Sequence, residues 1–540
     1  MSALVSMEVG SFKAFSDVQP VPLRPLTLLF GPNSAGKSSV IHALAYLHEA
    51  ATTRNLDVRH PRVGGTAVDL GGFPSFVHRR APAGRCDFGL EFAGKRLPES
   101  FIRLLARTPE SLKVTFTVGG VRLDRHQLSL LDLPGVGVGK DVVVTSIHLD
   151  IDNQAALRMS RRPDGSMRVD ALGRQWDPQR AMALAQRKAL EPTEHEAIWA
   201  FADRQLGALR VHGDGLCPTE VRIEKKAGGA TEKRPPRFED GLIRLVQAIV
   251  EEVGKLVQGE LQAFKYLGPL RSYPSRHVYE PRTGDADWLA GGAFAWTLVA
   301  QDEVLREKLN RWLGQEALQT RYELAVQSFT SLDEIREPLL AHLHSLNDGN
   351  DEDSVSEFDA DGAEGELPEI DWKLDEALLA IREASSGLLT SVGLRDLRTK
   401  TLVSHRDVGI GISQVLPVLA LAYGARQSLI GIEQPELHLH PALQSELADV
   451  FIESALKQGN TLVLETHSEH LILRLLRRIR EASTVAAAKG PHLRPEDLAV
   501  LYVEPTPAGT RVSEIPVRED GEFGAPWPQG FFAERMKELL

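Results

Sequence analysis

The segment Leu26-Thr-Leu-Leu-Phe30, followed directly by Gly31-Pro-Asn-Ser-Ala-Gly36-Lys37-Ser38, decides the fold. The apolar run predicts a buried strand, and residues Val40 to His48 predict the helix that follows the glycine-rich turn. The turn matches the pattern G-x-x-x-x-G-K-[ST] in the strand–turn–helix context that this pattern requires. Its backbone N–H groups would point at phosphate oxygens. We therefore predict a phosphate-binding loop; the alternative is a glycine-rich turn with an incidental lysine.

The residues that end this turn have side chains suited to a nucleotide. Lys37 is predicted to reach the β- and γ-phosphates of ATP as a point charge, and the Ser38 hydroxyl is predicted to ligate Mg²⁺. The full set predicted to contact ATP here is Gly31, Asn33, Ser34, Ala35, Gly36, Lys37, Ser38 and Ser39.

Polar side chains also follow two strands predicted much later in the chain. Glu433-Gln434-Pro435-Glu436 comes directly after the apolar run 428–432, at the strand end where ligands bind in open α/β sheets. A carboxylate there can hold Mg²⁺ directly or through water, so Glu433 is the second predicted metal ligand. His467 follows the next strand, 461–464, where it would meet a γ-phosphate; taken alone, it would be an ordinary loop histidine.

Composition excludes several classes of protein. Of 540 residues, 42% are hydrophobic and 25% charged, as in globular proteins, and the length predicts about two to four structural units. Two cysteines, Cys86 and Cys217, are too few for a disulfide framework and favour a reducing compartment. No apolar run approaches the roughly 18 residues of a membrane span, and no secretory signal is visible. We expect a cytoplasmic protein with no membrane partner.

The net charge of −12 comes almost entirely from one segment. Residues 348–371 contain eleven carboxylates and no Lys or Arg, so the rest of the chain sums to −1. Such a segment is predicted to be a disordered acidic loop. Elsewhere a local basic groove remains compatible with the charge.

The spacing of apolar residues predicts the organisation of the chain. Residues 86–169 alternate with period two around a Pro-Asp-Gly turn at 163–165, which predicts an antiparallel meander. From about residue 177 to 346 the period is mainly helical, and from about 394 short apolar runs predict a mostly parallel sheet with crossover helices. The expected α/β fold has an N-terminal lobe at 1–173, a mainly helical insertion at 174–385 and a C-terminal lobe at 386–540.

The order of these motifs resembles the ABC-type ATPases of the SMC/OLD group, within the bacterial AAA-family ATPases. The blocks that carry the resemblance are GPNSAGKSS, Gly409-Ile-Gly-Ile-Ser413-Gln414, Glu433-Gln-Pro-Glu436 and Thr466-His467, with Val68–Gly71, Tyr266–Arg276, Asp407–Pro417 and Trp527–Phe532 beside them. The resemblance implies an ABC-type P-loop head split by the helical insertion, and a homodimer that encloses two ATP molecules.

In that family the counterpart of Gly409 to Gln414 is the signature motif, which contacts the γ-phosphate held by the other subunit. The resemblance therefore places Gly411, Ser413 and Gln414 on ATP. Without it, the segment would be interpreted as a glycine turn capping the apolar helix that starts at Val415.

Gln434 departs from the family, in which an Asp-Glu pair ends this strand and the Glu polarises the attacking water. A neutral amide cannot accept a proton, although it can orient water. Glu436 would take the role of base, supported by His467, so Gln434, Glu436 and His467 are the predicted catalytic residues. We expect slow hydrolysis, as in a switch rather than a motor.

Related ATPases work in genome maintenance or anti-phage defence, as in the OLD, Septu and PARIS systems, commonly with a nuclease fused or encoded nearby. After His467 the sequence has no Toprim-like acidic pattern, HNH-type cluster or Cys₄ zinc site. The resemblance thus implies the sensor subunit of a defence complex whose nuclease or effector is a separate polypeptide. The alternative is a DNA-repair or recombination ATPase that binds duplex DNA directly; the large insertion disfavours an ABC-transporter subunit.

Basic residues outside these motifs leave alternatives open. Arg271 and Arg276 would either act in the site or stabilise a turn. The arginines after His467 would contact phosphates or form an exposed helical face. These are Arg474, Arg477, Arg478 and Arg480, whereas Lys225, Lys226, Lys233 and Arg234 are expected in a solvated loop.

Overall fold

The computed structural model describes residues 2–81, 84–121, 141–179, 192–223, 237–273, 288–316, 320–329, 389–484 and 490–528. The chain forms two compact units, one of Met1–Ser272, Thr283–Ala295 and Gly409–Leu540, the other of Tyr273–Arg282 and Trp296–Val408. The predicted acidic loop 348–371, Arg276 and the four basic residues between 225 and 234 lie outside the described residues.

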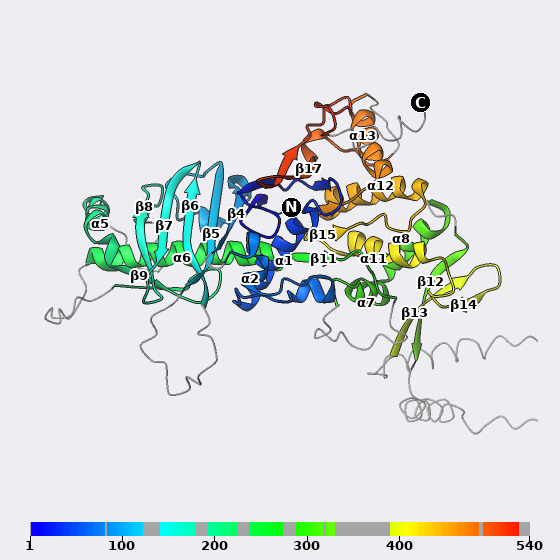
Figure 1. Ribbon diagram of the computed structural model, residues 1–540, viewed down its shortest axis with the longest axis horizontal. Helices are drawn as coiled ribbons and strands as arrows, with labels where there is room; N and C mark the ends of the chain where they lie inside the picture. The colour runs from blue at the N-terminus through cyan, green and yellow to red at the C-terminus, as the bar shows by residue number, and fades with distance from the viewer. Residues whose placement is uncertain are drawn as a thin grey trace, which may run out of the picture. The chain divides into compact units, whose positions relative to one another are not determined.

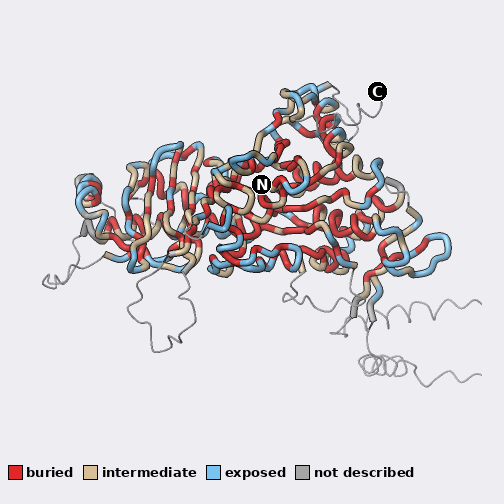
Figure 2. Tube along the Cα trace, in the orientation of Figure 1, coloured by how far each residue is buried: buried red, intermediate tan, exposed pale blue. Residues whose placement is uncertain are grey.

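A six-stranded, mostly parallel sheet forms the centre of the first unit (Figure 1). Its strand order is β11 (Phe264–Leu267), β15 (Leu429–Glu433), β16 (Thr461–Glu465), β3 (Leu26–Phe30), β17 (Leu498–Thr506) and β18 (Gly509–Glu514). Neighbours from β11 to β17 pair in parallel, and only β18 runs antiparallel to its neighbour. Every residue of β3, β15 and β16 is buried, which explains their unbroken apolar sequences (Figure 2). The predicted parallel sheet is confirmed.

Four helices follow or connect these strands. They are α1 (Lys37–Thr53), α11 (Ile410–Gly424), α12 (Pro441–Gln458) and α13 (Glu469–Thr484). The helix predicted over Val40 to His48 is present as α1, which starts earlier, at Lys37 within the glycine-rich turn. Helix α13 packs on α12. Helices α1, α12 and α13 follow the ends of β3, β15 and β16, and α11 follows its N-cap residue Gly409.

An antiparallel sheet of nine strands completes the first unit, in the order β10-β9-β8-β7-β6-β5-β4-β1-β2. In chain order its strands are β1 (Leu4–Gly10), β2 (Gln19–Pro22), β4 (Arg85–Ala93), β5 (Ser111–Val121), β6 (Asp141–Ile151), β7 (Gln154–Arg161), β8 (Met167–Leu172), β9 (Leu209–His212) and β10 (Glu220–Ile223). The turn at 163–165 joins β7 to β8, which confirms the predicted hairpin.

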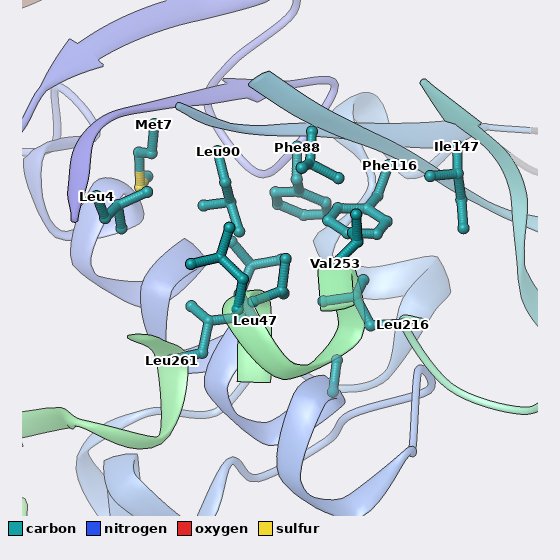
Figure 3. Packing of buried hydrophobic residues seen from close by; sticks show 14 of the residues in the cluster. Leu4, Met7, Leu47, Phe88, Leu90, Phe116, Ile147, Leu216, Val253 and Leu261 are labelled. Carbon is teal, nitrogen blue, oxygen red and sulfur yellow. The ribbon is translucent and has the colours of Figure 1, made fainter. Parts of the chain in front are cut away.

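One face of this sheet packs on helices α1 and α6 (Arg237–Gln262). Figure 3 shows Phe88 and Phe116 of the sheet pointing toward Val253 of α6, with Leu47 of α1 beside them. The alternating apolar residues of the predicted meander thus form its buried face, and the helical spacing predicted around 242–257 forms the matching face of α6.

The helical insertion predicted from residue 174 differs from the structure in its first hundred residues. Short helices are present there, α5 (Pro192–Gln205) among them, but β9 and β10 extend the antiparallel sheet, and β11 forms an edge of the parallel sheet. All three strands have only four residues. A strand of four residues is too short to show a periodicity of apolar residues. The prediction for this region therefore followed the helical spacing of the long amphipathic helix α6.

The second unit contains a small antiparallel sheet and helices. Its strands are β12 (Tyr322–Phe329), β13 (Leu389–Asp396) and β14 (Thr401–Val403), and helix α8 (Glu303–Arg311) precedes them, after α7 (Ala293–Gln301). The Asn310 side chain joins α8 to β12, because its Oδ1 accepts from Leu324 N at 2.6 Å and its Nδ2 donates to Leu324 O at 3.2 Å. In the described part of the chain, no helix has the length and hydropathy to cross a membrane.

Candidate functional site

The glycine-rich turn has the backbone that the predicted phosphate-binding loop requires. Gly31 has a φ of +143°, and a Cβ there would lie 2.0 Å from the carbonyl oxygen of Val503. Gly36, the N-cap of α1, has a φ of +104°. Since L side chains rarely adopt such angles, only glycine lets the chain wrap this tightly at both points. No acidic residue lies in the first turn of α1, so its N-terminal dipole is free to attract an anion.

Lys37 is held beneath this turn. Its side chain is 3% exposed, and Nζ donates to the carbonyl oxygens of Gly31 at 3.1 Å and Pro32 at 3.0 Å. Burial lowers the pKa of Lys37, and the negative charge of Glu465, 3.8 Å away, opposes that shift. The ammonium group is therefore held at the glycine-rich turn by two backbone carbonyl oxygens. Of the other predicted contacts, Ala35 and Ser39 are buried, whereas Asn33 and Ser34 are exposed.

Two carboxylates lie side by side at the ends of β15 and β16. Glu433 and Glu465 are direct partners across the parallel pair. The Ser38 hydroxyl donates to Glu465 Oε2 at 2.6 Å. Glu433 Oε1 instead accepts from the Tyr266 hydroxyl at 3.0 Å and lies 3.2 Å from His42 Nε2. The sequence prediction paired Ser38 with Glu433, whereas the structure places Glu465 on Ser38.

Glu436 and His467, two of the predicted catalytic residues, lie together. The backbone N–H of His467 donates to Glu436 Oε1 at 2.8 Å. Glu436 Oε2 is buried and accepts no hydrogen bond from the described residues. Burial raises the pKa of Glu436, whereas burial and the nearby Lys37 charge lower the pKa of His467. Burial thus disfavours the charged form of both groups, the carboxylate of Glu436 and the imidazolium of His467.

Gln434 occupies a strained turn. Its φ is +45°, in the left-handed region, which costs a non-glycine residue about 1–2 kcal/mol. Three hydrogen bonds hold its backbone there. The N–H of Gln434 donates to Glu465 O at 2.8 Å, and its carbonyl accepts from the Arg271 guanidinium and from Leu437 N, each at 3.1 Å. The backbone of Gln434 is therefore fixed between the end of β16 and Arg271.

The segment predicted to correspond to the signature motif forms the first turn of α11. Gly411 lies so close to the chain before α12 that a Cβ would be 2.7 Å from the carbonyl oxygen of His438. Ser413 and Gln414 are 1% and 6% exposed. Gly409 and Ile410 are exposed, and Gly411 and Ile412 are partly exposed.

Arg271 connects this segment to the end of β15. Gln414 Nε2 donates to Arg271 O at 2.8 Å, and the buried Arg271 guanidinium donates to the carbonyl oxygens of Gln414 at 3.3 Å and Glu433 at 2.8 Å. Of the two alternatives left open for Arg271, the structure shows a structural link, and this link reaches the predicted catalytic Gln434.

The arginines after His467 belong to helix packing instead of the site. Arg478 is 8% exposed and forms a bidentate pair with Asp449 of α12, at 2.7 and 2.5 Å. Arg474 pairs with Glu446 of the same helix. Both side chains are largely buried in ion pairs between the two helices. Arg474 and Arg478 therefore match neither sequence alternative, contact with phosphates or an exposed helical face. Arg477 and Arg480 are exposed on α13 and pair with carboxylates there and in the C-terminal segment.

Sequence reasoning missed four side chains in this cluster: Glu465, Tyr266, His42 and Lys13. Lys13 Nζ lies 2.7 Å from His42 Nδ1, and burial lowers the pKa of Lys13 to about 8. Glu465 could have been found, because it ends a predicted strand in the same way as Glu433. Tyr266 begins the block Tyr266–Arg276 of the resemblance, but no role was assigned to it, and none of the quoted blocks contains His42 or Lys13.

The oxygen atoms in the cluster fit Mg²⁺ only in part. Among the described residues, no three His, Cys, Asp or Glu side chains are placed to hold a metal ion by themselves. Mg²⁺ usually takes one or two protein carboxylates and completes its shell with water and phosphate oxygens. Ser38, Glu433 and Glu465 are compatible with that mode of binding, in which a nucleotide supplies the remaining ligands.

Comparison with known proteins supports part of the predicted relationship. Residues 291–474 match the family model described as "AAA domain, putative AbiEii toxin, Type IV TA system". A search of curated proteins gave no match. The matched segment contains the signature-like residues, Glu433 to Glu436 and His467, so similarity to AAA domains covers the C-terminal half of the site.

Solved structures with a similar arrangement include three SMC head domains. The Smc head bound to the C-terminal winged-helix domain of ScpA has 9% identity and a TM-score of 0.37, covering 95% of this chain and 98% of that one. An Smc head with an extended coiled coil, bound to the C-terminal domain of ScpA from Pyrococcus furiosus, has 9% identity and a TM-score of 0.37. The match covers 100% of this chain and 99% of that one. The SMC head domain from Thermotoga maritima has 10% identity and a TM-score of 0.32, and the match covers 96% of this chain and 100% of that one. Scores this low assign neither an activity nor a partner to this chain.

Proposed function

We propose that this chain binds ATP with Mg²⁺ at the loop between β3 and α1 and hydrolyses it slowly. The observation that supports this most strongly is one buried cluster in which the glycine-rich loop meets the ends of two neighbouring strands. Lys37, Ser38 and Glu465 are joined there by a hydrogen bond of 2.6 Å and an ion pair of 3.8 Å. Helix α1, which is 17 residues long, starts at the same point, and its N-terminus favours binding of a phosphate group.

The residues around the cluster would have different roles in ATP hydrolysis. Lys37 would turn from two carbonyl oxygens to the β- and γ-phosphates, and Mg²⁺, when bound, would neutralise charge that develops on them. Glu436 has an unused buried oxygen for the attacking water, and a raised pKa makes a carboxylate a stronger base. Gln434 can orient that water but cannot take its proton, which supports slow turnover.

Dimerisation around the nucleotide and a role in defence belong to the same proposal. Each ATP would be enclosed between the Lys37 loop of one subunit and the N-terminus of α11 of a second copy. The chain would then act as a sensor subunit for a separate nuclease or effector. Two observations support this: the resemblance of the signature-like segment, and a family model described as a putative toxin of a type IV toxin–antitoxin system.

The test is phosphate release by the purified full-length protein, alongside Lys37→Ala and Gln434→Glu. We expect slow turnover that is lost in the Lys37 variant and increased about tenfold or more by the carboxylate at 434, because general-base catalysis contributes roughly 10²–10⁴-fold. Fast turnover of the wild type would contradict the restrained hydrolysis.

Duplex DNA is added in a parallel series of the same assay. Under the defence proposal, DNA leaves the rate unchanged. A many-fold, salt-sensitive increase would instead favour a DNA-repair or recombination ATPase that binds duplex DNA directly.

A further inference from the structure

We propose that Glu465, rather than Glu433, is the carboxylate that positions Ser38 for the metal ion of the nucleotide. This inference rests on the proposed function, since it concerns the same loop. It assigns a role to a side chain at the end of β16 that belongs to none of the motifs recognised in the sequence.

Strand order explains why Glu465 reaches the loop first. Strand β16 lies directly between β3 and β15, and Glu465 pairs in register with Leu29, two residues before Gly31. Glu433 ends β15 and is therefore one strand farther from the loop. Neighbouring strands are about 4.8 Å apart, so this difference decides which carboxylate contacts Ser38.

The hydrogen bond between the two side chains has the direction that metal binding needs. A serine hydroxyl has one proton to donate and two lone pairs. The proton of Ser38 goes to Glu465 Oε2, at the 2.6 Å typical of a hydroxyl bonded to a charged carboxylate. The lone pairs then face away from Glu465 and are available to a cation. A carboxylate placed behind a ligand in this way orients it and strengthens it as a donor.

Glu433 is held by other partners. Its Oε1 accepts from the Tyr266 hydroxyl and lies next to His42 Nε2. The contact of Glu465 with Lys37 is the weaker of its two interactions, because it spans 3.8 Å and both Lys37 hydrogen bonds go to backbone carbonyls. Glu465 therefore acts through Ser38 as a positioning residue.

The experiment measures binding of a non-hydrolysable ATP analogue to the full-length protein by calorimetry, in Mg²⁺ and in EDTA. In Glu465→Gln we expect the affinity in EDTA to stay within about twofold of the wild type. We expect the gain in affinity on adding Mg²⁺ to fall about 10- to 100-fold, the usual effect of removing such a supporting carboxylate. Glu433→Gln is expected to lose less of this gain, and Glu504→Gln, on β17 of the same sheet, none.

A double-variant cycle with Ser38→Ala separates this role from a general effect on folding. If Glu465 acts through Ser38, the losses in the Mg²⁺-dependent gain are not additive. Glu465→Asp, which keeps the charge but shortens the side chain, repeats the measurement should the glutamine variant unfold. Tighter binding in both conditions, or an equal loss in both, overturns the inference. No binding by the wild type, or binding unaffected by Lys37→Ala, overturns the proposed function instead.

Discussion

At the scale of the residue, the site combines side chains that the sequence predicts with others that only the fold brings in. Lys37 and Ser38 could be predicted because their loop has a fixed spacing and a fixed strand–turn–helix context. Glu465 differs, because its partner Ser38 is 427 positions away and the contact depends on which strand lies beside β3. A single sequence predicts which residues end strands, but strand order is a tertiary property.

His405, in the second unit, is expected to make stability depend on pH. It is 3% exposed and its ring lies 4.8 Å from that of Trp296. Burial lowers the pKa of His405 to about 4, from about 6.5 when unfolded. The folded state thus favours the neutral ring, so this contribution to stability is complete above pH 6.5 and is lost as the pH falls toward 4.

The loss between pH 7.5 and pH 5 should be about 2 kcal/mol for this group. His405→Phe keeps a ring against Trp296 but cannot be protonated. We therefore expect the fall in its free energy of unfolding between these pH values to be smaller than that of the wild type by about 2 kcal/mol. Urea unfolding of both proteins at the two pH values, followed by tryptophan fluorescence, measures the difference. Identical pH dependence in the two proteins would show that His405 does not titrate in this range.

At the scale of the element, long patterns were predictable and short strands were not. The local sequence pattern was sufficient to predict the buried strands β3, β15 and β16 and the amphipathic helix α6. The four-residue strands β9, β10 and β11 exist because longer neighbours offer them a hydrogen-bonding edge. Since β11 leads to Arg271, missing it also hid the link between α11 and the end of β15.

The ion pairs between α12 and α13 lead to a prediction about helix packing. Arg478→Ala removes the bidentate partner of Asp449, whose side chain is only 18% exposed. Breaking such a pair costs about 3–5 kcal/mol when fully buried, so we expect about 3 kcal/mol here. Arg477, 62% exposed on the same helix, is the matched control, and Arg477→Ala should cost less than about 1 kcal/mol.

Thermal unfolding of the two arginine variants, with and without the ATP analogue, checks this prediction. The expected result is a lower melting temperature for Arg478→Ala and unchanged analogue affinity at a temperature where the protein is folded. Weaker binding of the analogue with an unchanged melting temperature would mean that Arg478 contacts phosphate after all.

At the scale of the whole molecule, the site is assembled from distant parts of the chain within one compact unit. The loop at 31–38, Tyr266 and Arg271, the α11 segment and the ends of β15 and β16 all belong to the first unit, whose sequence is interrupted by the second. The division at Ser272 lies well after the predicted start of an insertion at Arg174, because the intervening strands extend both sheets of the first unit.

The surface that the α11 segment leaves exposed decides how the proposed dimer would form. Ser413 and Gln414 are buried, whereas Ile410 is 49% exposed at the start of α11. If a second copy closes over ATP at this point, Ile410→Glu puts a charge against the triphosphate and the partner surface. We expect that variant to bind the ATP analogue with wild-type affinity per monomer, yet to fail to dimerise in Mg²⁺ and analogue when examined by light scattering. Leu473→Glu, at 47% exposure on α13, is the matched control and should dimerise normally. If Ile410→Glu dimerises as the wild type does, ATP is not enclosed at the N-terminus of α11, and the nucleotide acts within a single chain.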